Sequence, residues 1–421
     1  MTVTHKNWAG NVTYSTKVIH VPASLEMVQE QVRNSHKIKA LGSRHSFNKI
    51  GDTDAELISL ENFRGIVSLD TDKQTVTVEG GIRYGDLCEQ LHEQGFALHN
   101  LASLPHISVI GACSTATHGS GVNNGNLATA VSAIEFIQAD GELVTLSRES
   151  DGEAFLGAVV GLGGLGVVTK ITLDVVPAFD MRQDVYIDLP FAQLEAHFDA
   201  IMSSAYSVSL FTDWTGDVIN QVWIKSRVEG DSVFNPKPEF YGATQATRKM
   251  HPLPDSDPEP STEQMGVTGA WYDRLPHFRM AFKPSRGDEL QTEYFVAHKD
   301  GYQALLALNA IREQIAPVLL VCEVRTIARD DLWMSPCYQA ERVAFHFTWK
   351  PDEGALQRLL PVLEAQLAPF NPTPHWGKVF TLSPEVVQSR YTRLGDFRDL
   401  LSVYDPDGKF RNPFLGTYVF E

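Results

Sequence analysis

The chain has 421 residues, of which 43% are hydrophobic, 21% charged and 10% aromatic. This composition is typical of a folded globular protein and excludes a mainly disordered, collagen-like or coiled-coil chain, and the length predicts two domains or one domain with a large insertion. The formal net charge of −17 makes nucleic acid and anionic membrane surfaces unfavourable partners.

The first part of the chain predicts a mixture of short strands and helices. A strand is predicted at 18–21, and Ser24 is the predicted N-cap of an amphipathic helix over about 25–32. The segment 131–146 contains Asp140-Gly141 between two β-rich runs, which predicts a hairpin. A helix at 84–94 is predicted to follow four further strands, at 38–41, 57–60, 66–69 and 75–78.

Residues 161–166 (GLGGLG) match the GxGxxG pattern of dinucleotide-binding turns. In that fingerprint the glycines follow a strand and open a helix, whereas here they precede the β-branched run 167–176. The sequence therefore predicts a strand after the glycines and argues against a nicotinamide-binding Rossmann domain. The glycines then indicate a close backbone approach, either between two elements or to some other cofactor.

Beyond about Pro177 the chain predicts a second, α+β unit. Its proline-rich stretch 251–260 cannot continue a helix or a central strand and predicts a surface loop. A helix at 302–314 separates the first two of three predicted strands, at 290–296, 318–327 and 343–349. The four cysteines lie far apart without metal-ligand spacing, and no apolar run suits a signal peptide or a membrane span. We therefore expect buried thiols, no metal and a cytoplasmic protein.

Two of these predicted strands each present a pair of polar side chains. Alternate residues of a strand project to the same face, so Glu323 shares a face with Arg325, and His346 shares one with Thr348. One interpretation is a solvated sheet face with an ordinary ion pair, because half-exposed strands commonly alternate in this way. The other is a substrate site, because a carboxylate, a guanidinium, an imidazole and a hydroxyl together can orient several substrate hydroxyls.

Two further segments carry side chains that could take part in binding or proton transfer. The predicted strand at 38–41 runs into residues 42–46 (GSRHS), which offer backbone amides, hydroxyls and a cation, a composition suited to holding phosphate. Residues 375–378 (HWGK) place an imidazole and an amine close together in the chain. A single histidine is more often structural than catalytic, so neither segment is decisive alone.

Taken in order, these segments resemble the vanillyl-alcohol-oxidase family of flavoproteins, and within it the alditol (xylitol, sorbitol) oxidases. The likeness spans nearly the whole chain. The matching segments are 42–47 (GSRHSF), 101–108 (LASLPHIS), 115–121 (TATHGSG), 322–326 (CEVRT), 346–348 (HFT), 375–378 (HWGK) and 405–410 (DPDGKF), with Asn412.

This resemblance implies an α+β chain with a two-domain PCMH-type FAD-binding fold. That fold consists of two α/β subdomains, with an inserted α+β substrate domain built on a mainly antiparallel sheet. The expected FAD-binding domain covers residues 1–177 and the expected substrate domain covers 178–374. Residues 375–421 are expected to form a C-terminal segment that returns to the FAD domain and the active site.

The resemblance also implies FAD bonded covalently, through its 8α-methyl group, to His45. Arg44 stands where some relatives carry glycine, which leaves the linking histidine in place. The remaining cofactor-binding positions implied by the resemblance are Leu41, Gly42, Ser43, Arg44, Ser46, Ser103, Ser108, Gly111, Thr115, Ala116, Thr117, His118, Val168 and His375.

The implied reaction oxidises the terminal primary hydroxyl of an alditol to the aldose, with hydride transfer to flavin N5 and reduction of oxygen to hydrogen peroxide. Lys378 is the expected base, because the like charge of a neighbouring Arg325 would lower its pKa. Arg325 would hold the reacting oxygen, and Glu323 would accept a hydrogen bond from the next hydroxyl. The rest of the polyol would be held by Ser103, His346 and Thr348.

Two alternative functions stay open. The sugar-lactone oxidoreductases share the flavin motifs, the Glu-x-Arg pair and His-Trp-x-Lys, so an aldonolactone (gulono- or galactonolactone) oxidase or dehydrogenase is the nearest enzyme. A flavin-bearing polyol-binding protein without turnover is a hypothesis of a different class. The expected partners are a small polyol and molecular oxygen, with no nucleic acid and no membrane, and the expected state is a monomer.

Overall fold

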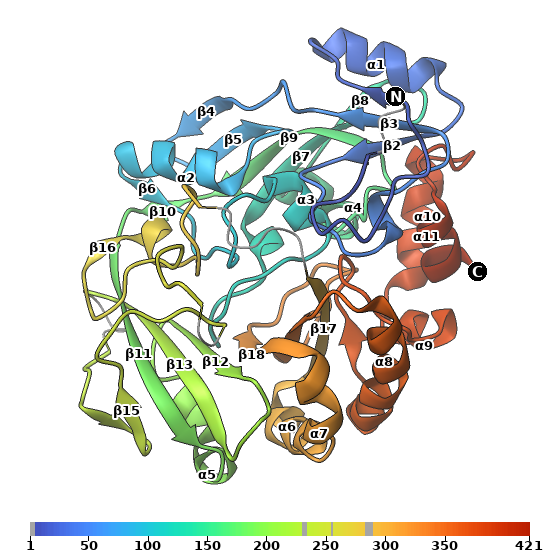
Figure 1. Cartoon of the computed structure of the whole chain (residues 1–421). Coiled ribbons are helices and arrows are strands. Elements are labelled where there is room, and N and C mark those ends of the chain that lie inside the picture. The colour runs from blue at the N-terminus through green and yellow to red at the C-terminus, as the bar shows by residue number, and fades with distance from the viewer. Residues whose placement is uncertain (1–4, 230–233, 254–255, 283–288) are drawn as a thin grey trace.

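The computed structural model describes residues 5–229, 234–253, 256–282 and 289–421. Figure 1 shows an upper half that carries the first part of the chain and a lower half built around one large sheet. The C-terminal helices α10 (Leu394–Tyr404) and α11 (Pro413–Leu415) lie at the side of the upper half. The chain therefore returns to its first unit after building the second.

The upper half begins with a small parallel sheet of three strands in the order β1-β3-β2. The strands are β1 (Ile19–His20), β2 (Ile38–Leu41) and β3 (Glu56–Ser59), and α1 (Leu25–Asn34) connects β1 to β2. Ser24 caps α1, because its hydroxyl accepts the backbone N–H of Met27. The predicted N-cap, helix and flanking strands are therefore confirmed.

A five-stranded antiparallel sheet in the order β4-β5-β9-β7-β8 forms the centre of the upper half. Its strands are β4 (Ile66–Asp70), β5 (Thr75–Glu79), β7 (Val131–Ile137), β8 (Leu143–Ser147) and β9 (Val167–Asp174). The hairpin predicted at Asp140-Gly141 joins β7 to β8, and Gly141 has a φ of 87° that favours glycine. The short strands β6 (Phe96–Ala97) and β10 (Val176–Pro177) pair beside this sheet.

The glycines of residues 161–166 precede strand β9, as predicted, and open no helix. Gly166 has a φ of 157°, and a Cβ on it would lie 2.2 Å from the carbonyl oxygen of Ile137 on the neighbouring strand. Gly166 thus serves a close backbone approach between strands, and the Rossmann interpretation is excluded. An approach of these glycines to another cofactor stays a prediction.

One hydrophobic core joins the early helices of the chain to the C-terminal helices. It contains buried residues of α2, α3 and α4 together with Phe397, Leu401 and Leu415 from the C-terminal segment. Asn412 adds a polar tie, because its side-chain amide donates to the carbonyls of Ile50 and Asp52. The helices that contribute to this core are α2 (Tyr84–Glu93), α3 (Val109–Ser114), α4 (Arg148–Val159) and α9 (Pro384–Gln388), with α10 and α11. The exact domain limits stay a prediction.

The lower half is one large sheet whose strand pairs are all antiparallel, in the order β14-β15-β11-β13-β12-β18-β19-β17-β20, with β16 beside β11. Its strands are β11 (Asp180–Pro190), β12 (Ser207–Thr212), β13 (Val218–Arg227), β14 (Glu239–Phe240), β15 (Ala243–Gln245), β16 (Gly269–Ala270), β17 (Leu290–Ala297), β18 (Leu319–Ile327), β19 (Arg342–Trp349) and β20 (Thr373–Pro374). The three strands predicted here are confirmed as β17, β18 and β19. The α+β class with a mainly antiparallel sheet is confirmed as well.

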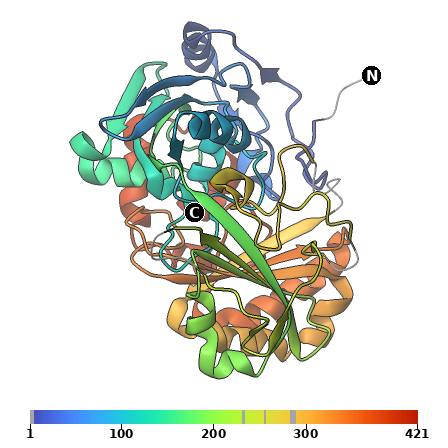
Figure 2. The same cartoon turned by 90° about the vertical axis from the view of Figure 1, so that its left-hand side faces the viewer.

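Helices cover the lower face of this sheet and leave its upper face for the other half, as Figures 1 and 2 show. The covered face supplies a second hydrophobic core. The helix predicted at 302–314 is divided into two. The covering helices are α5 (Gln193–Met202), α6 (Gly301–Asn309), α7 (Arg312–Ile315) and α8 (Glu353–Leu367).

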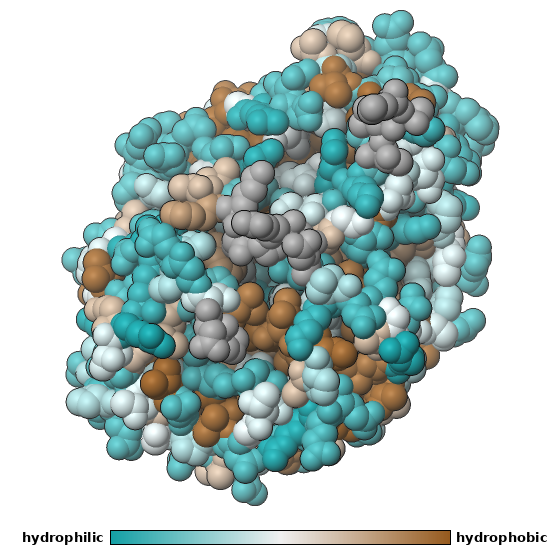
Figure 3. Space-filling view, in the orientation of Figure 1, coloured by the Kyte–Doolittle hydropathy of each residue, from teal (hydrophilic) through white to brown (hydrophobic). Residues whose placement is uncertain are grey.

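Most of the face seen in Figure 3 is hydrophilic. The four cysteines are buried and unpaired, as predicted. Among the described residues, no helix is long and apolar enough to cross a membrane. Within the same ranges, no three potential ligands gather in the manner of a metal site.

Candidate active site

A cavity with about 2100 Å³ of empty space, part of it open to solvent, lies between the two halves. Its lining comes from the segments around residues 39–48 and 102–118, from the upper face of the large sheet, and from the turn at 375–378. Segments from the beginning, middle and end of the chain therefore share one site.

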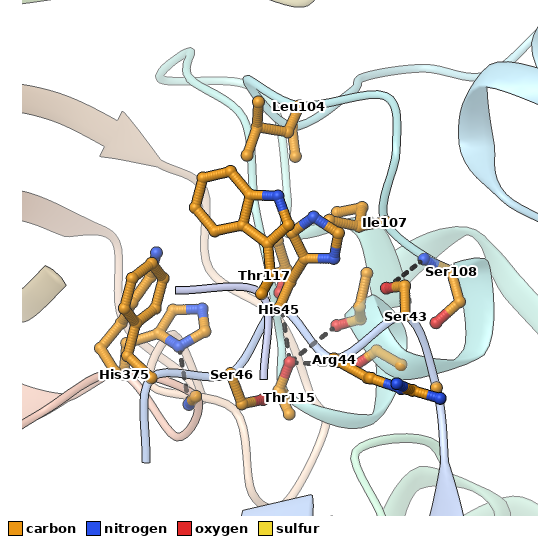
Figure 4. A pocket seen from close by; sticks show the side chains of 18 of the residues that line it. Ser43, Arg44, His45, Ser46, Leu104, Ile107, Ser108, Thr115, Thr117 and His375 are labelled. Atoms are coloured by element: carbon orange, nitrogen blue, oxygen red, sulfur yellow. Dashed lines mark hydrogen bonds between the residues drawn. The ribbon is translucent and has the colours of Figure 1, made fainter. Parts of the chain in front are cut away.

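The loop after β2 forms one wall of the cavity through close backbone contacts (Figure 4). A Cβ on Gly42 would lie 2.9 Å from Ser108 Oγ, and one on Gly111 would lie 2.6 Å from the same atom. Ser43 Oγ accepts the backbone N–H of Ser108 at 3.0 Å. Arg44 has a φ of 64°, a left-handed conformation that costs a non-glycine residue free energy and needs support from its surroundings.

All but one of the expected cofactor-binding residues border the cavity. Ala116 is the exception, because its side chain is buried outside the lining, with a φ of 52°. Its neighbours Thr115 and Thr117 bring their hydroxyl oxygens within 3.2 Å of each other (Figure 4). The bordering residues are Leu41, Gly42, Ser43, Arg44, His45, Ser46, Ser103, Ser108, Gly111, Thr115, Thr117, His118, Val168 and His375.

His45 has the properties of a neutral, nucleophilic imidazole. Its ring stacks on Trp8 with the ring centroids 5.3 Å apart, and its buried Nδ1 has no hydrogen-bond partner. Burial, helped by the neighbouring His106, lowers the pKa of His45 to about 4. A cavity-lining imidazole with an unpartnered nitrogen, beside hydroxyls and glycines, fits the dinucleotide cofactor implied by the resemblance.

The polar end of the cavity is formed by strand β18 and its neighbours. Glu323 and Arg325 point into the cavity, whereas Cys322 and Val324 pack into the core below the sheet, as the alternation predicted. Glu323 is only 4% exposed and Arg325 only 6%. The interpretation of a solvated sheet face is therefore wrong. His346 and Thr348 of β19 line the same end.

Glu293, which the sequence analysis did not identify, completes the charge balance at this end. Its Oε1 lies 2.6 Å from Arg325 Nη2 and 3.1 Å from His118 Nε2. Burial alone would raise the pKa of Glu293, but Arg325 and His118 outweigh that effect and hold it well below its usual value. Arg325, together with His277, likewise holds the pKa of Glu323 below its usual value despite burial.

Gln291 was also missed, although the sequence contained a signal for it. Its Oε1 accepts from Lys378 Nζ and from His346 Nε2, and its Nε2 donates to Glu289 at 2.6 Å. Gln291 and Glu293 alternate within the strand predicted at 290–296, in the same pattern that singled out Glu323 and Arg325. The same reasoning applied to β17 would have found both.

Lys378 is held between this sheet and the loop that follows His45. The side-chain amide of Asn48 donates to the carbonyls of Trp376 at 2.8 Å and Lys378 at 2.7 Å. The Phe47 N–H donates to the Gly377 carbonyl at 2.7 Å. The pKa of Lys378 is lowered to about 8, mainly by burial.

The cause of this shift differs from the one expected. The like charge of Arg325 does lower the pKa of Lys378, but it acts after burial and after the opposing effect of Glu293. The expected direction of the shift is therefore confirmed, and like-charge repulsion as its main cause is wrong.

Comparison with known proteins gives consistent similarities. Residues 16–147 match a family described as an FAD binding domain, and residues 284–418 match the D-arabinono-1,4-lactone oxidase family. The chain is 46% identical over 413 residues to an alditol oxidase of Streptomyces sp., covering 97% of both chains. It is 27% identical over 437 residues to the L-gulonolactone oxidase of Mus musculus, covering 98% of this chain and 97% of the relative.

The similarity extends to solved structures. The crystal structure of cholesterol oxidase from B. sterolicum superposes with a TM-score of 0.77 at 13% identity, covering 99% of this chain and 96% of that chain. At this identity the likeness concerns the fold alone. It supports the expected PCMH-type fold.

The buried imidazoles predict how stability depends on pH. Burial lowers the pKa to about 4 for His45 and His277 and to about 3 for His346 and His375. An unfolded histidine titrates near pH 6.5, so between about pH 6.5 and 4 the unfolded state binds more protons than the folded state. The free energy of unfolding should therefore be retained above about pH 6.5 and fall as the pH drops towards 4. Asp330, whose pKa burial raises to about 6, and Asp405, whose pKa burial also raises, oppose this trend.

Replacement of one imidazole measures its contribution to the pH dependence of the free energy of unfolding. His346→Gln should flatten the pH dependence of the free energy of unfolding by up to about 1.4 kcal/mol per pH unit, the value for one proton. Urea unfolding between about pH 4.5 and 7 measures it. His36→Gln, at an exposed position, is the matched control. Equal slopes for the two variants would contradict the assignment of His346 as a buried neutral group.

Proposed function

The chain belongs to the alditol oxidase family of FAD-dependent oxidoreductases, and from this membership and the polar end of its cavity we propose oxidation of the terminal primary hydroxyl of alditols such as xylitol and sorbitol. Oxygen is the acceptor, and the balanced reaction is R–CH2OH + O2 → R–CHO + H2O2. The observation that carries this proposal is the polar group at one end of the cavity, in which Glu323 and Arg325 are buried and His346 and Lys378 are half-buried. These side chains offer donors and acceptors for several adjacent hydroxyls.

FAD, when bound, supplies the two-electron acceptor for the substrate carbon. The residues proposed to hold it are those of the loop after β2, with Ser108, Thr115 and Thr117, and His45 is proposed to bond it covalently. Ser43 and Ser108 are already held together by the hydrogen bond from the Ser108 N–H to Ser43 Oγ. This part of the cavity wall therefore does not need to reorganise when FAD binds. The cytoplasmic location and the monomeric state stay predictions.

Lys378 is the proposed base for the hydroxyl proton. A pKa of about 8 leaves a useful fraction of neutral amine near neutral pH, and the buried setting favours that neutral form. Gln291 and the Asn48 clamp hold the lysine in place. Arg325 Nε is buried without a hydrogen-bond partner, so this N–H is free to donate to the reacting oxygen.

The remaining polar side chains are proposed to bind the hydroxyls of the polyol that do not react. Glu323 is proposed to accept from the hydroxyl next to the reacting carbon, because an ionised carboxylate accepts strong hydrogen bonds. Thr348 and His346 lie further along the same wall and are proposed to hold the rest of the polyol, together with Ser103 from the opposite half.

An aldonolactone oxidase or dehydrogenase is the competing activity, and one observation favours it: residues 284–418 match the D-arabinono-1,4-lactone oxidase family. Those residues contain the Glu323, Arg325 and Lys378 positions, so the polar end alone does not separate an open-chain polyol from a lactone. The greater identity to the alditol oxidase supports the polyol.

The first prediction tests the activity and the acceptor together. Purified protein given xylitol or sorbitol in air should form aldose and hydrogen peroxide one for one, with gulono- and galactonolactone at least about tenfold poorer in kcat/KM. Peroxide and aldose assays measure this. Faster turnover of the lactones would favour the competing activity, turnover with a dye but not with oxygen would exclude an oxidase, and xylitol binding without product would indicate a binding protein.

The second prediction concerns Lys378. The kcat/KM for xylitol should rise with pH through about 8 and level above it, because the base must lose its proton before it can accept one. Lys378→Met should lower kcat/KM by about 10²- to 10⁴-fold and remove this rise, with the bound flavin unchanged. Lys299→Met, at an exposed position, is the matched control. A pH rise that persists in Lys378→Met would assign the base elsewhere.

The third prediction concerns the covalent bond. Flavin should remain on the denatured chain, so the protein band in a denaturing gel should fluoresce. His45→Ala should give a dark band while the folded protein still binds FAD, because the phosphate-holding backbone is unchanged. His251→Ala, at another histidine that borders the cavity, should remain fluorescent. A fluorescent His45→Ala band would place the bond on another residue, and a dark parent band would exclude a covalent bond.

A further inference from the structure

Three buried side chains, Lys225, His277 and Glu323, form a hydrogen-bonded series whose last two members border the cavity, and the proposed mechanism uses only Glu323. Lys225 Nζ lies 3.1 Å from His277 Nδ1, and His277 Nε2 lies 2.7 Å from Glu323 Oε1. Lys225 is 1% exposed, and its amine also donates to the carbonyls of Leu275 at 2.6 Å and Pro276 at 2.8 Å. This series of hydrogen-bonded side chains thus runs from a buried amine to the edge of the substrate cavity.

The donor and acceptor roles of Lys225, His277 and Glu323 follow from their chemistry. Burial, helped by Lys225, lowers the pKa of His277 to about 4, so near neutral pH the ring carries only one N–H. Glu323 is ionised and can only accept, so that hydrogen must be on Nε2. Nδ1 is then an acceptor. Lys225 Nζ lies against three acceptors, the two carbonyls and Nδ1, and it can donate to all three only as an ammonium. The acceptor-only Glu323 sets the tautomer of His277, and Lys225 is the partner of its other nitrogen.

The imidazole ring is also fixed in position. Its centroid lies 5.2 Å from that of Trp223 and 5.5 Å from that of Phe211, both in edge-on arrangements. The backbone N–H of His277 donates to the Ser103 carbonyl at 3.1 Å. Packing and hydrogen bonding together leave the ring no alternative orientation toward Glu323.

This arrangement gives the two oxygens of Glu323 different tasks. Oε1 is occupied by His277, whereas Oε2 lies 3.6 Å from Arg325 Nε and 4.0 Å from His346 Nδ1, both beyond ordinary hydrogen-bond length. Oε2 therefore keeps its capacity to accept a hydrogen bond from a hydroxyl in the cavity.

We propose that His277, fixed between Lys225 and Glu323, is a positioning residue that aims Glu323 Oε2 at the hydroxyl next to the reacting carbon and so sets the preference for substrates that carry this hydroxyl. This inference rests on the proposed polyol oxidation. His277 acts through Glu323 and makes no contact of its own with the reacting atoms in this assignment. Loss of the ring should therefore affect only substrates with the adjacent hydroxyl.

The test compares xylitol with pentane-1,3,5-triol, which has the same chain length and lacks the hydroxyl next to each end. The parent should prefer xylitol in kcat/KM. In His277→Leu that preference should fall by about tenfold, the size expected for a weakened charged hydrogen bond, while kcat/KM for the triol stays within about threefold. Flavin absorbance and thermal unfolding confirm that the variant is folded and loaded.

Three further variants separate positioning from a general structural role. His277→Gln should recover much of the preference, because the glutamine amide can donate where Nε2 did. Lys225→Met keeps the buried volume and should lose preference in the same direction as His277→Leu, and it provides the test if His277→Leu does not fold. In Glu323→Gln, adding His277→Leu should change the preference by less than about twofold. His197→Leu, outside the cavity, is the control.

The outcomes distinguish this inference from the proposed function. If the parent oxidises no polyol, the proposed function fails and the inference fails with it. If the parent oxidises xylitol and His277→Leu lowers kcat/KM for both substrates equally, or changes neither, the proposed function stands and the positioning role is wrong. A parent with equal kcat/KM for xylitol and the triol would also overturn the inference, because Glu323 would then hold no adjacent hydroxyl.

Discussion

The pairing of the buried Arg325 with the buried Glu293 and Glu323 is the interaction on which the site depends. Buried charges are tolerated only when opposite charges lie close, and removal of one partner commonly costs about 3–5 kcal/mol. The register of β17, β18 and β19 places Glu293 and Glu323 on either side of His346, in one row across three strands. A slip of one residue would turn these side chains into the apolar core below the sheet.

A second constraint joins the two ends of the cavity. The loop after His45 holds the turn at 375–378 through Phe47 and Asn48, so the residue proposed to bond the cofactor and the proposed base belong to one hydrogen-bonded unit. The C-terminal segment can supply Lys378 to this place because its helices share the core of the first unit. Catalysis needs such fixed geometry, since small displacements of reacting groups are costly.

Burial divides the polar groups of the cavity into charged and neutral sets. The two carboxylates stay ionised because Arg325 compensates them, whereas the imidazoles of His45, His277 and His346 are kept neutral. Neutral rings can act as a nucleophile, a tautomer-specific donor or a hydrogen-bonding wall without adding charge. Lys378 lies between these sets, with a pKa close to the working range of a base.

Local features could be predicted from the sequence: the cap at Ser24, the hairpin at 140–141, the strand after the glycines of 161–166, and the alternation that put Glu323 and Arg325 on one face. These depend on neighbouring residues and on helix or strand periodicity, which a sequence displays directly. The burial of this face, the pairing of Glu293 with Arg325, and the contact of Lys225 and His277 with each other and with Glu323 depend on the complete fold. The contacts of Arg325 with Glu293, of His277 with Glu323 and of Lys225 with His277 join residues 32, 46 and 52 positions apart. They depend on strand order and on the packing of the two halves. Periodicity shows to which face of an element a side chain projects, and only the fold shows which residues it contacts.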